Sequence, residues 1–432
     1  MRESSIFDLG GGILDKKMVF RYKLILCVVL AIVLGIAVGW YIKYVRNAIP
    51  ERITLNENSN GTIDFNLPFV GTASLHDKDG EILETALNLT SPLTINSGET
   101  AEFNIEVKLF GLFDIKNVKV EVKEEEAVVA GGIPVGIYIE TDGVLVVDLG
   151  EVVDSNGEIT SPSKGSLMAG DYIIAVDDYG VDSKETLIAL VANYNGDYLK
   201  IDVRRNGAIE TVKIKPTLDK SGVYKLGVWV RDDCQGLGTL TYIDKEGAFG
   251  TLGHAISDGD TGKIVEIAEG SLYTARIWSI IKGAEGAPGE IIGSINYGET
   301  SYLGEISDNE TIGIYGTVDE QIYAYVDEVY VDVAYKQDVQ KGSAVIRTFV
   351  GNEIQDYEIK ITELSYSDSG MNKGIEFIVT DKELLGLTNG IVQGMSGSPI
   401  LQNGRIVGAV THVLVNDPTR GYGIFIENML EH

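Results

Sequence analysis

The sequence predicts a mainly β protein with an N-terminal membrane helix, and three observations support this fold class. The 432 residues include 51 glycines, which indicates many turns. From residue 47 to the end, short apolar runs of alternating pattern recur between turn residues, as in β-rich domains. Near the N-terminus, one uncharged stretch is long enough to cross a bilayer. Apolar residues make up 44% of the chain, so it can bury sizeable cores and is not globally disordered.

The uncharged stretch is Leu24–Ile42, 19 residues that would span about 28 Å as a helix. Five basic residues precede it and two follow closely: Arg2, Lys16, Lys17, Arg21 and Lys23, then Lys43 and Arg46. By the positive-inside rule, residues 1–23 are expected in the cytoplasm, residues 24–42 in the membrane and the remainder outside. The stretch is long for a signal peptide and no A-x-A cleavage site follows it, so an uncleaved anchor is expected.

The charge of the chain limits its partners. Asp and Glu outnumber Lys and Arg by 64 to 35, a net charge of −29. The first 46 residues carry seven basic and three acidic residues (+4), which leaves −33 for everything after them. A surface this acidic repels phosphate backbones, so no nucleic-acid partner is expected.

The two cysteines indicate neither a disulfide nor a metal site. Cys27 would lie in the bilayer and Cys234 in the exported part, so the two cannot pair within one chain. No group of Cys and His residues has metal-ligand spacing. We therefore expect no metal and no cofactor, and stability that depends on packed cores.

The exported part divides into three. Residues 47–129 contain alternating runs such as Thr62–Leu67, Ala101–Leu109 and Asn117–Lys123, separated by turn signals. Short β runs at this spacing predict a small β-sandwich-like domain. No catalytic pattern is found there.

Residues 130–216 contain strands around a probable helix, Ser183–Asn193, and a hairpin at Asn206-Gly207. The Ser161-Pro162 start and the Gly170-Asp171 pair before an Ile-Ile strand resemble a bacterial PDZ domain; an ordinary αβ domain is the alternative. PDZ domains add a peptide as an extra strand and hold its carboxylate in backbone N–H groups. The resemblance implies a peptide-binding loop at the glycine-rich start: Gly131, Gly132, Ile133, Pro134, Val135 and Gly136.

Residues 217–432 are again strand-rich and hold the sharpest motif, Gly394-Met-Ser396-Gly-Ser-Pro399. A serine nucleophile needs a nearby base and donors for the developing oxyanion. This turn can aim the N–H groups of Gly394 and Ser396 at one point, which predicts an oxyanion hole. The Asn403-Gly404 hairpin that follows is the layout of chymotrypsin-like proteases, so a double β-barrel is expected; a purely structural turn is the alternative.

The general base is one of four histidines. His432 is C-terminal and His76 falls in the 47–129 domain, which leaves His254 and His412. Small residues flank His254 and leave room for its ring to reach a partner. His412 follows Ser396 by 16 residues, on the strand expected to hold the substrate backbone. His254 is therefore favoured as the base and His412 as a residue of the substrate strand.

Three aspartates could orient the imidazole. Asp258 is four residues past His254, and Asp308 falls soon after the base, where a chymotrypsin-like chain has its acid. Asp381 lies 15 residues before Ser396 and could equally cap the short helix that follows it. Spacing does not choose among them.

Three segments carry a family resemblance: Leu252–Asp258, Gly390–Pro399 and Val410–Gly423. With the anchor and the PDZ-like part, they are similar to the SpoIVB peptidase family, the membrane-anchored PDZ serine peptidases of endospore-forming bacteria. The similarity covers nearly everything after residue 130. It implies that Ser396 is the nucleophile, His254 the base and Asp381 the acid.

The resemblance also implies a role in sporulation. Such proteins are made in the forespore and exported across its inner membrane, where they cut the regulatory partner of an intramembrane metalloprotease. That protease then processes the precursor of a mother-cell sigma factor, and the peptidase also cleaves itself near its N-terminus. The expected partners are this protein substrate, a peptide ligand and the membrane. A housekeeping envelope PDZ protease and a non-catalytic PDZ scaffold are the alternative functions.

Overall fold

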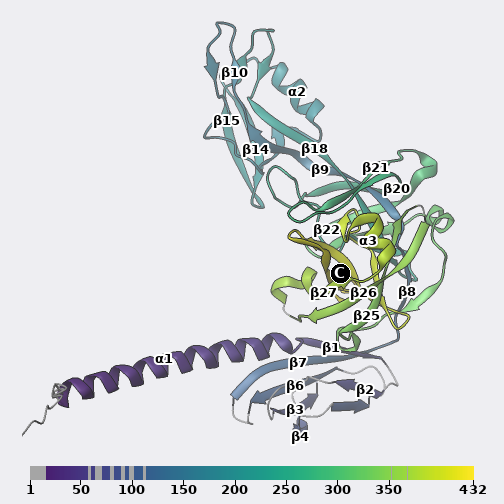
Figure 1. Cartoon of the computed structure of the whole chain (residues 1–432). Coiled ribbons are helices and arrows are strands. Elements are labelled where there is room, and N and C mark those ends of the chain that lie inside the picture. The colour runs from purple at the N-terminus through teal and green to yellow at the C-terminus, as the bar shows by residue number, and fades with distance from the viewer. Residues whose placement is uncertain are drawn as a thin grey trace, which may run out of the picture. The chain divides into compact units, whose positions relative to one another are not determined.

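The computed structural model describes residues 16–56, 60–63, 71–77, 82–88, 93–96, 102–109, 113–351, 353–366 and 368–432 (Figure 1). The chain divides into two compact units. One comprises the chain up to Arg52 with Thr62–Thr94 and Glu102–Val120, and the other comprises Ile53–Gly61, Ile95–Ala101 and Glu121–His432.

The first unit begins with helix α1 (Lys16–Ala48), which confirms the predicted N-terminal apolar helix. Its segment Phe20–Arg46 is long and apolar enough to cross a membrane. The helix extends beyond the predicted 24–42 segment at both ends, and residues 1–15 lie outside the described part of the chain.

The described residues of the N-terminal β region form these strands: β1 (Arg52–Asn56), β2 (Asn60–Ile63), β3 (Gly71–Asp77), β4 (Ile82–Asn88), β5 (Leu93–Asn96), β6 (Glu102–Leu109) and β7 (Phe113–Lys123). Strands β7, β6, β3 and β4 are neighbours in that order. β3 pairs antiparallel with both β4 and β6. The predicted β-rich character of this region is confirmed.

The second unit contains a six-stranded barrel formed by β9 (Pro134–Leu149), β18 (Val228–Ile243), β19 (Ala248–Thr251), β23 (Gly313–Val318), β22 (Tyr302–Glu310) and β20 (Ile267–Ile281). β20 pairs back with β9 through Ile267–Thr274 and so closes the barrel. Val135, Ile137 and Ile139 alternate along β9 and are fully buried, as period-two patterning requires.

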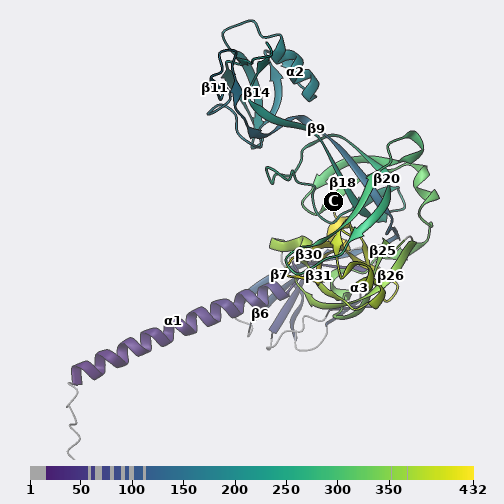
Figure 2. The ribbon, with the colours of Figure 1, turned by 45° about the horizontal axis from the view of Figure 1, so that its top comes forward.

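A PDZ-like lobe is inserted between the first two strands of this barrel. β9 and β18 continue beyond the barrel and pair again from Leu145 to Leu149, where β12 (Tyr172–Val176) joins β9. Figure 2 shows β9 leading from the lobe that holds α2 (Lys184–Ala192) and β14 (Leu199–Arg205). β15 (Ala208–Ile214) completes the sheet. Helix α2 lies within the segment Ser183–Asn193 where the sequence predicts a helix, and Ser183 is its cap. The short strands are β10 (Val152–Val153), β11 (Ile159–Thr160), β13 (Tyr179–Gly180), β16 (Thr217–Leu218) and β17 (Tyr224–Lys225).

This insertion shifts the predicted boundaries at residues 130, 216 and 217. Residues 134–141 of the predicted PDZ-like segment form barrel wall, because they pair with β18 on one side and β20 on the other. Conversely, Leu226 lies in the core of the lobe with Leu187 and Val191, and Tyr224, Val228 and Val230 pack against it. One pair of strands therefore belongs to both parts.

The second barrel closes in the order β25 (Gly342–Val350), β26 (Glu353–Leu364), β27 (Ile375–Val379), β31 (Asp417–Phe425), β30 (Arg405–Leu414) and β29 (Pro399–Gln402). Ile346, Tyr357, Phe377 and Phe425 lie in its core. The predicted double β-barrel is confirmed. The other elements are β8 (Ala127–Ala130), β21 (Gly289–Ile295), β24 (Tyr330–Asp332), β28 (Val392–Gln393), α3 (Lys382–Thr388), α4 (Ile426–Leu430), η1 (Glu299–Ser301), η2 (Glu320–Ala324), η3 (Lys336–Asp338) and η4 (Asp368–Lys373).

Candidate active site

One cavity of about 610 Å³ brings together three of the residues singled out in the sequence: Ser396, His254 and His412. Its lining comes from both barrels. His254 follows β19 of the first barrel, whereas Ser396 precedes β29 and His412 lies on β30 of the second. A site between two barrels is the arrangement that a two-barrel peptidase requires.

The Ser396 loop turns tightly because two of its residues are glycines in left-handed conformations, Gly394 at φ 99° and Gly397 at φ 92°. A Cβ atom on Gly397 would lie 1.9 Å from the carbonyl oxygen of Thr239, so only glycine fits. The N–H of Gly397 donates to Val410 and that of Ser398 donates to Met395. In the described chain no partner occupies the N–H groups of Gly394 and Ser396, which leaves both predicted oxyanion donors available.

Two threonines of β18 hold this loop, and sequence reasoning missed both. The Thr239 hydroxyl donates to the Gly394 carbonyl over 2.9 Å, and its N–H donates to the Ser396 carbonyl over 2.9 Å. The Thr241 hydroxyl donates to the Gly397 carbonyl over 2.7 Å. The first barrel therefore positions the turn that carries the predicted nucleophile of the second. The alternation of Thr239 and Thr241 with apolar residues near the end of β18 was the signal in the sequence.

The hydroxyl of Ser396 donates to the carbonyl oxygen of Thr411 over 2.9 Å. No hydrogen bond joins Ser396 to His254 within the described residues. Catalytic hydrogen bonds are often long or unformed before substrate binds. In this state the serine hydroxyl is held by the second barrel's own backbone.

His254 lies in a tight turn that begins with two residues in left-handed conformations, Leu252 at φ 66° and Gly253 at φ 67°. Its Nδ1 lies 2.8 Å from the carbonyl oxygen of Ala255. If Nδ1 carries the proton and donates it to this carbonyl, Nε2 is left as the free acceptor, which is the tautomer a general base needs. Burial lowers the pKa of His254 below its ordinary value.

His412 lies beside His254, with 5.2 Å between the two ring centroids. Burial, then the neighbouring His254 and Lys373, lower the pKa of His412 to about 4. Its Nδ1 is buried without a hydrogen-bond partner. His412 is therefore neutral across the physiological range.

The three candidate acids lie outside the cavity lining. Asp381 caps α3, because its carboxylate accepts the N–H groups of Glu383 and Leu384 over 2.8 and 3.0 Å. Asp258 is buried and pairs with Arg231, and Asp308 lies 3.5 Å from His432. Within the described chain, His254 has a backbone carbonyl on Nδ1 and no carboxylate. The role of Asp381 as the acid stays a prediction.

The cavity beside Ser396 is apolar. Ile391 and Val392 lie on one side, and Val413 and Val415 follow His412 on β30 and just beyond it. None of its described lining residues is Asp, Glu, Lys or Arg. The space suits an uncharged, apolar substrate side chain.

Residues 222–430 match the family SpoIVB peptidase S55. This part of the chain is a SpoIVB-type serine peptidase domain. The predicted family and the predicted class of enzyme, a serine endopeptidase, are both confirmed. The S55 match begins at residue 222, so it leaves out the part of β9 that closes the first barrel. No curated protein matches the chain.

Several solved structures are similar to parts of the chain. The PDZ domain of an SdrC-like protein from Listeria monocytogenes is 29% identical over 21% of this chain and 90% of that chain, with a TM-score of 0.18. The active form of the Rv3671c protease from M. tuberculosis is 12% identical over 46% of this chain and 72% of that chain, with a TM-score of 0.28. The HtrA-type protease AlgW with a decapeptide is 13% identical over 48% of this chain and 52% of that chain, also at 0.28.

The predicted peptide-binding loop, Gly131–Gly136, runs into the barrel strand β9, which begins at Pro134. The N–H groups of Gly131 and Gly132 already donate to the carbonyls of Thr241 and Leu240. A Cβ atom on Gly131 would lie 2.4 Å from the Leu240 oxygen. These glycines are explained by close packing of the barrel, and they do not line a groove of the PDZ-like lobe.

A different groove, of about 500 Å³, lies in the PDZ-like lobe. Leu187, Ile188 and Val191 of α2 line one wall, and residues 223–230 line the other. Ile188 and Trp229 are largely exposed there. A strand edge facing a helix is the geometry that β-augmentation by a peptide needs, so the groove is a second candidate for the peptide site. Peptide binding by Gly131–Gly136 stays a prediction.

Proposed function

We propose that Ser396 is the nucleophile and His254 the general base of a membrane-anchored endopeptidase that cuts few protein partners. The observation that carries this proposal is the meeting of Ser396, His254 and two unpartnered backbone N–H groups at one cavity. The S55 family match supports it.

In the proposed mechanism, Ser396 first rotates away from Thr411 toward His254. Its Oγ attacks the scissile carbonyl carbon while His254 Nε2 takes the hydroxyl proton, and the carbonyl oxygen becomes an oxyanion. The N–H groups of Gly394 and Ser396 donate to that oxyanion, and loss of one such donor typically costs about 10²–10³-fold in rate. His254 then gives its proton to the leaving amine, and water hydrolyses the acyl-enzyme by the reverse proton path.

The neighbouring groups would support this cycle in different ways. The Ala255 carbonyl fixes the tautomer of neutral His254 and stabilises the imidazolium once it forms. His412 lies on β30, the proposed substrate strand, and shapes the cavity beside the base. Asp381 remains the proposed acid by resemblance, and in this state it acts as the cap of α3.

The apolar cavity suggests the substrate preference. We expect cleavage after an apolar residue such as Leu or Val, because a charged side chain would be buried without a partner there. Thioester substrates that differ only at this position test the expectation. Equal turnover of the Leu and Lys esters would contradict it.

The family match and the anchor support the proposed biological role. We propose that the peptidase is exported from the forespore across its inner membrane, with residues 1–23 in the cytoplasm. It would cut the regulatory membrane partner of an intramembrane metalloprotease, so that a mother-cell sigma factor precursor is processed. Self-cleavage near the N-terminus would release it from α1, and the groove of the PDZ-like lobe would dock a peptide of a partner.

The test is fluorophosphonate labelling of the full-length chain in detergent, comparing wild type with Ser396→Ala. Labelling of the wild type alone would support an activated Ser396. Labelling that persists in Ser396→Ala would place the nucleophile elsewhere, and none in either chain would favour a scaffold. Co-expression with the partner then separates a signalling peptidase from a housekeeping protease. A signalling peptidase cleaves the partner and leaves unfolded casein intact.

A further inference from the structure

The loop that carries the predicted base, residues 252–266, contains almost no regular structure. Asn309 fixes this loop to the first barrel at two points, because it accepts from the Ile256 N–H over 2.8 Å and donates to the carbonyls of Ile256 and Val265 over 2.9 Å each. Between these points the backbone pairs with itself, as the Asp258 N–H donates to the Lys263 carbonyl over 2.9 Å. Side-chain contacts add further attachments to neighbouring elements.

Asp258 is the buried centre of this loop, with only 1% of its surface exposed. Its carboxylate accepts the N–H groups of Thr261 and Asp260, over 2.8 and 3.2 Å. It also pairs with the guanidinium of Arg231, which contacts the exposed carboxylate of Asp260 over 2.9 Å. A buried carboxylate is costly without such a partner, so removing Arg231 would unsettle the whole loop.

Arg231 lies on β18 directly after residues 228–230, which line one wall of the peptide groove. The next residue, Asp232, accepts the backbone N–H of Lys184 over 2.9 Å and its ammonium over 2.7 Å. Lys184 is the first residue of α2, which forms the other wall. Arg231 and Asp232 therefore connect the groove to the barrel: Asp232 binds the start of α2, and Arg231 binds Asp258 in the His254 loop.

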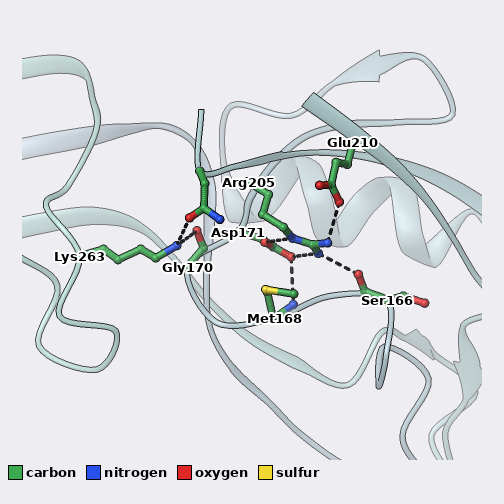
Figure 3. Close-up of polar contacts among 8 residues, drawn as sticks. Ser166, Met168, Gly170, Asp171, Arg205, Glu210 and Lys263 are labelled. Atoms are coloured by element: carbon green, nitrogen blue, oxygen red, sulfur yellow. Dashed lines mark hydrogen bonds and ion pairs between the residues drawn. The ribbon is translucent and has the colours of Figure 1, made fainter. Parts of the chain in front are cut away.

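A second contact ties the same loop to the PDZ-like lobe (Figure 3). The ammonium of Lys263 donates to the Gly170 carbonyl over 3.2 Å and lies 3.4 Å from Asn206 Oδ1. Its partner is rigid, because the neighbouring Asp171 is fully buried and binds Arg205 through both carboxylate oxygens. Gly170 has a φ of 87°, a left-handed conformation that favours glycine, and the Lys263 side chain packs directly against it.

We propose that Arg231 and Asp258 are a positioning pair that places the His254 loop and makes its position depend on the state of the peptide groove. A peptide that adds to residues 228–230 would shift or order Arg231, and Asp258 would transmit the change to the base four residues earlier. The inference rests on the proposed role of His254. Neither residue touches substrate, and the pair acts through the imidazole.

The first test measures the rate of fluorophosphonate labelling in the full-length chain in detergent. Asp258→Asn and Arg231→Ala should each slow labelling about tenfold or more, because small displacements of a catalytic group are costly. Arg231→Lys should recover part of the rate. Asp260→Asn is the matched control, since it lies in the same loop and contacts the same guanidinium but is exposed, and it should stay within about twofold of wild type.

Hydrogen exchange separates positioning from general destabilisation. In Asp258→Asn, faster exchange should be confined to residues 254–263, with the second barrel unchanged. If Asp258→Asn does not fold, Arg231→Lys carries the same readouts. A folded Asp258→Asn or Arg231→Ala that labels at the wild-type rate would overturn the proposal. This exchange pattern is readable even if Ser396 labels in no variant, which is the failure of the proposed function.

The second test fills the groove covalently. Ile188 on α2 is 61% exposed, so a cysteine in the variant Ile188→Cys can be modified with hexyl methanethiosulfonate. The treated wild-type chain is the control for modification of Cys27 and Cys234. Modification should change the labelling rate at least about threefold, and Asp258→Asn should remove that response. No change on modification, or an equal change in Asp258→Asn, would show that the groove and the base are not coupled through this pair.

Discussion

The Oγ of Ser396 lies 2.9 Å from the carbonyl oxygen of Thr411, one residue before His412 on the same strand. The hydroxyl proton of the predicted nucleophile is thus used in an internal hydrogen bond. A rotation about χ1 of Ser396 must precede chemistry, and a substrate backbone that pairs with β30 would compete for the same carbonyl. Substrate binding and release of the serine would then be one event.

The two histidines of the cavity should respond differently to substitution. His254→Ala should lower the rate of Ser396 labelling by about 10²–10⁴-fold, the usual contribution of a general base. His412→Gln should cost much less, because the ring has no hydrogen bond to lose at Nδ1. Labelling kinetics with circular dichroism as the folding control check this. The assignment of the base is wrong if the losses are reversed.

Two substitutions of Asp381 should separate its role as the cap of α3 from its proposed role as the acid. Asparagine is as good a helix cap as aspartate, so Asp381→Asn should keep α3, whereas Asp381→Ala should destabilise the protein by about 1 kcal/mol. We expect the activity loss in Asp381→Asn to be smaller than in Ser396→Ala or His254→Ala. Urea unfolding and labelling are measured side by side. A loss as large as that of His254→Ala, at unchanged stability, would establish Asp381 as the acid.

On the acid side, the rate of Ser396 labelling should reach half of its maximum at a pH below 6.5. Only neutral His254 can accept a proton, and burial lowers its pKa from the ordinary value of 6.5. The rate should therefore rise with pH through a midpoint below that value. A pH series of the labelling rate, each point corrected for probe hydrolysis, measures it. A midpoint above 6.5 would mean that a carboxylate stabilises the imidazolium after all.

Stability should decline over a defined acid window because of His412. Its folded-state pKa is about 4 and its ordinary value is 6.5, so the unfolded chain binds the proton more tightly. The free energy of unfolding should consequently decrease as the pH falls from about 6.5 to about 4. His412→Gln should flatten this part of the curve measured by urea unfolding. An identical slope in that variant would assign the proton uptake to other groups.

Thr241→Val should weaken both the fold and the reaction. The substitution keeps the shape of the side chain and leaves the buried Gly397 carbonyl without its donor, which costs about 1–3 kcal/mol. It should also slow labelling, since the turn at Ser396 loses a support. Thr211→Val is the matched control, because the Thr211 hydroxyl donates to Asp202 at an exposed position. Equal effects in the two variants would remove Thr241 from the support of the site.

Gly131→Ala should lower the stability of the protein without changing its affinity for peptide. The added methyl group would meet the backbone of Leu240 at 2.4 Å, and overpacking of this kind costs about 1–3 kcal/mol. Gly180→Ala, with open space around the site, should have little effect. Urea unfolding measures both. A Gly131→Ala chain of full stability that fails to bind peptide would restore the glycine-rich loop as the docking site.

Local patterns in the sequence predicted the features that depend on neighbouring residues. The apolar run of α1, the helix α2 and the tight turn around Ser396 each need only a few adjacent positions. The alternating strands likewise predicted a mainly β fold. These features follow from side-chain period and backbone sterics, which act over short distances along the chain.

Contacts between distant segments decided the rest. Closure of the first barrel pairs β9 with β20, more than a hundred residues later, and this pairing makes Val135 and Gly136 barrel wall and the PDZ-like lobe an insertion. The same tertiary packing placed His254 and His412 side by side, put Thr239 against the Ser396 loop and left Asp381 on its helix. The alternation of apolar residues along a strand does not indicate its partner strand, because strand pairing depends on the burial of whole faces and not on local spacing.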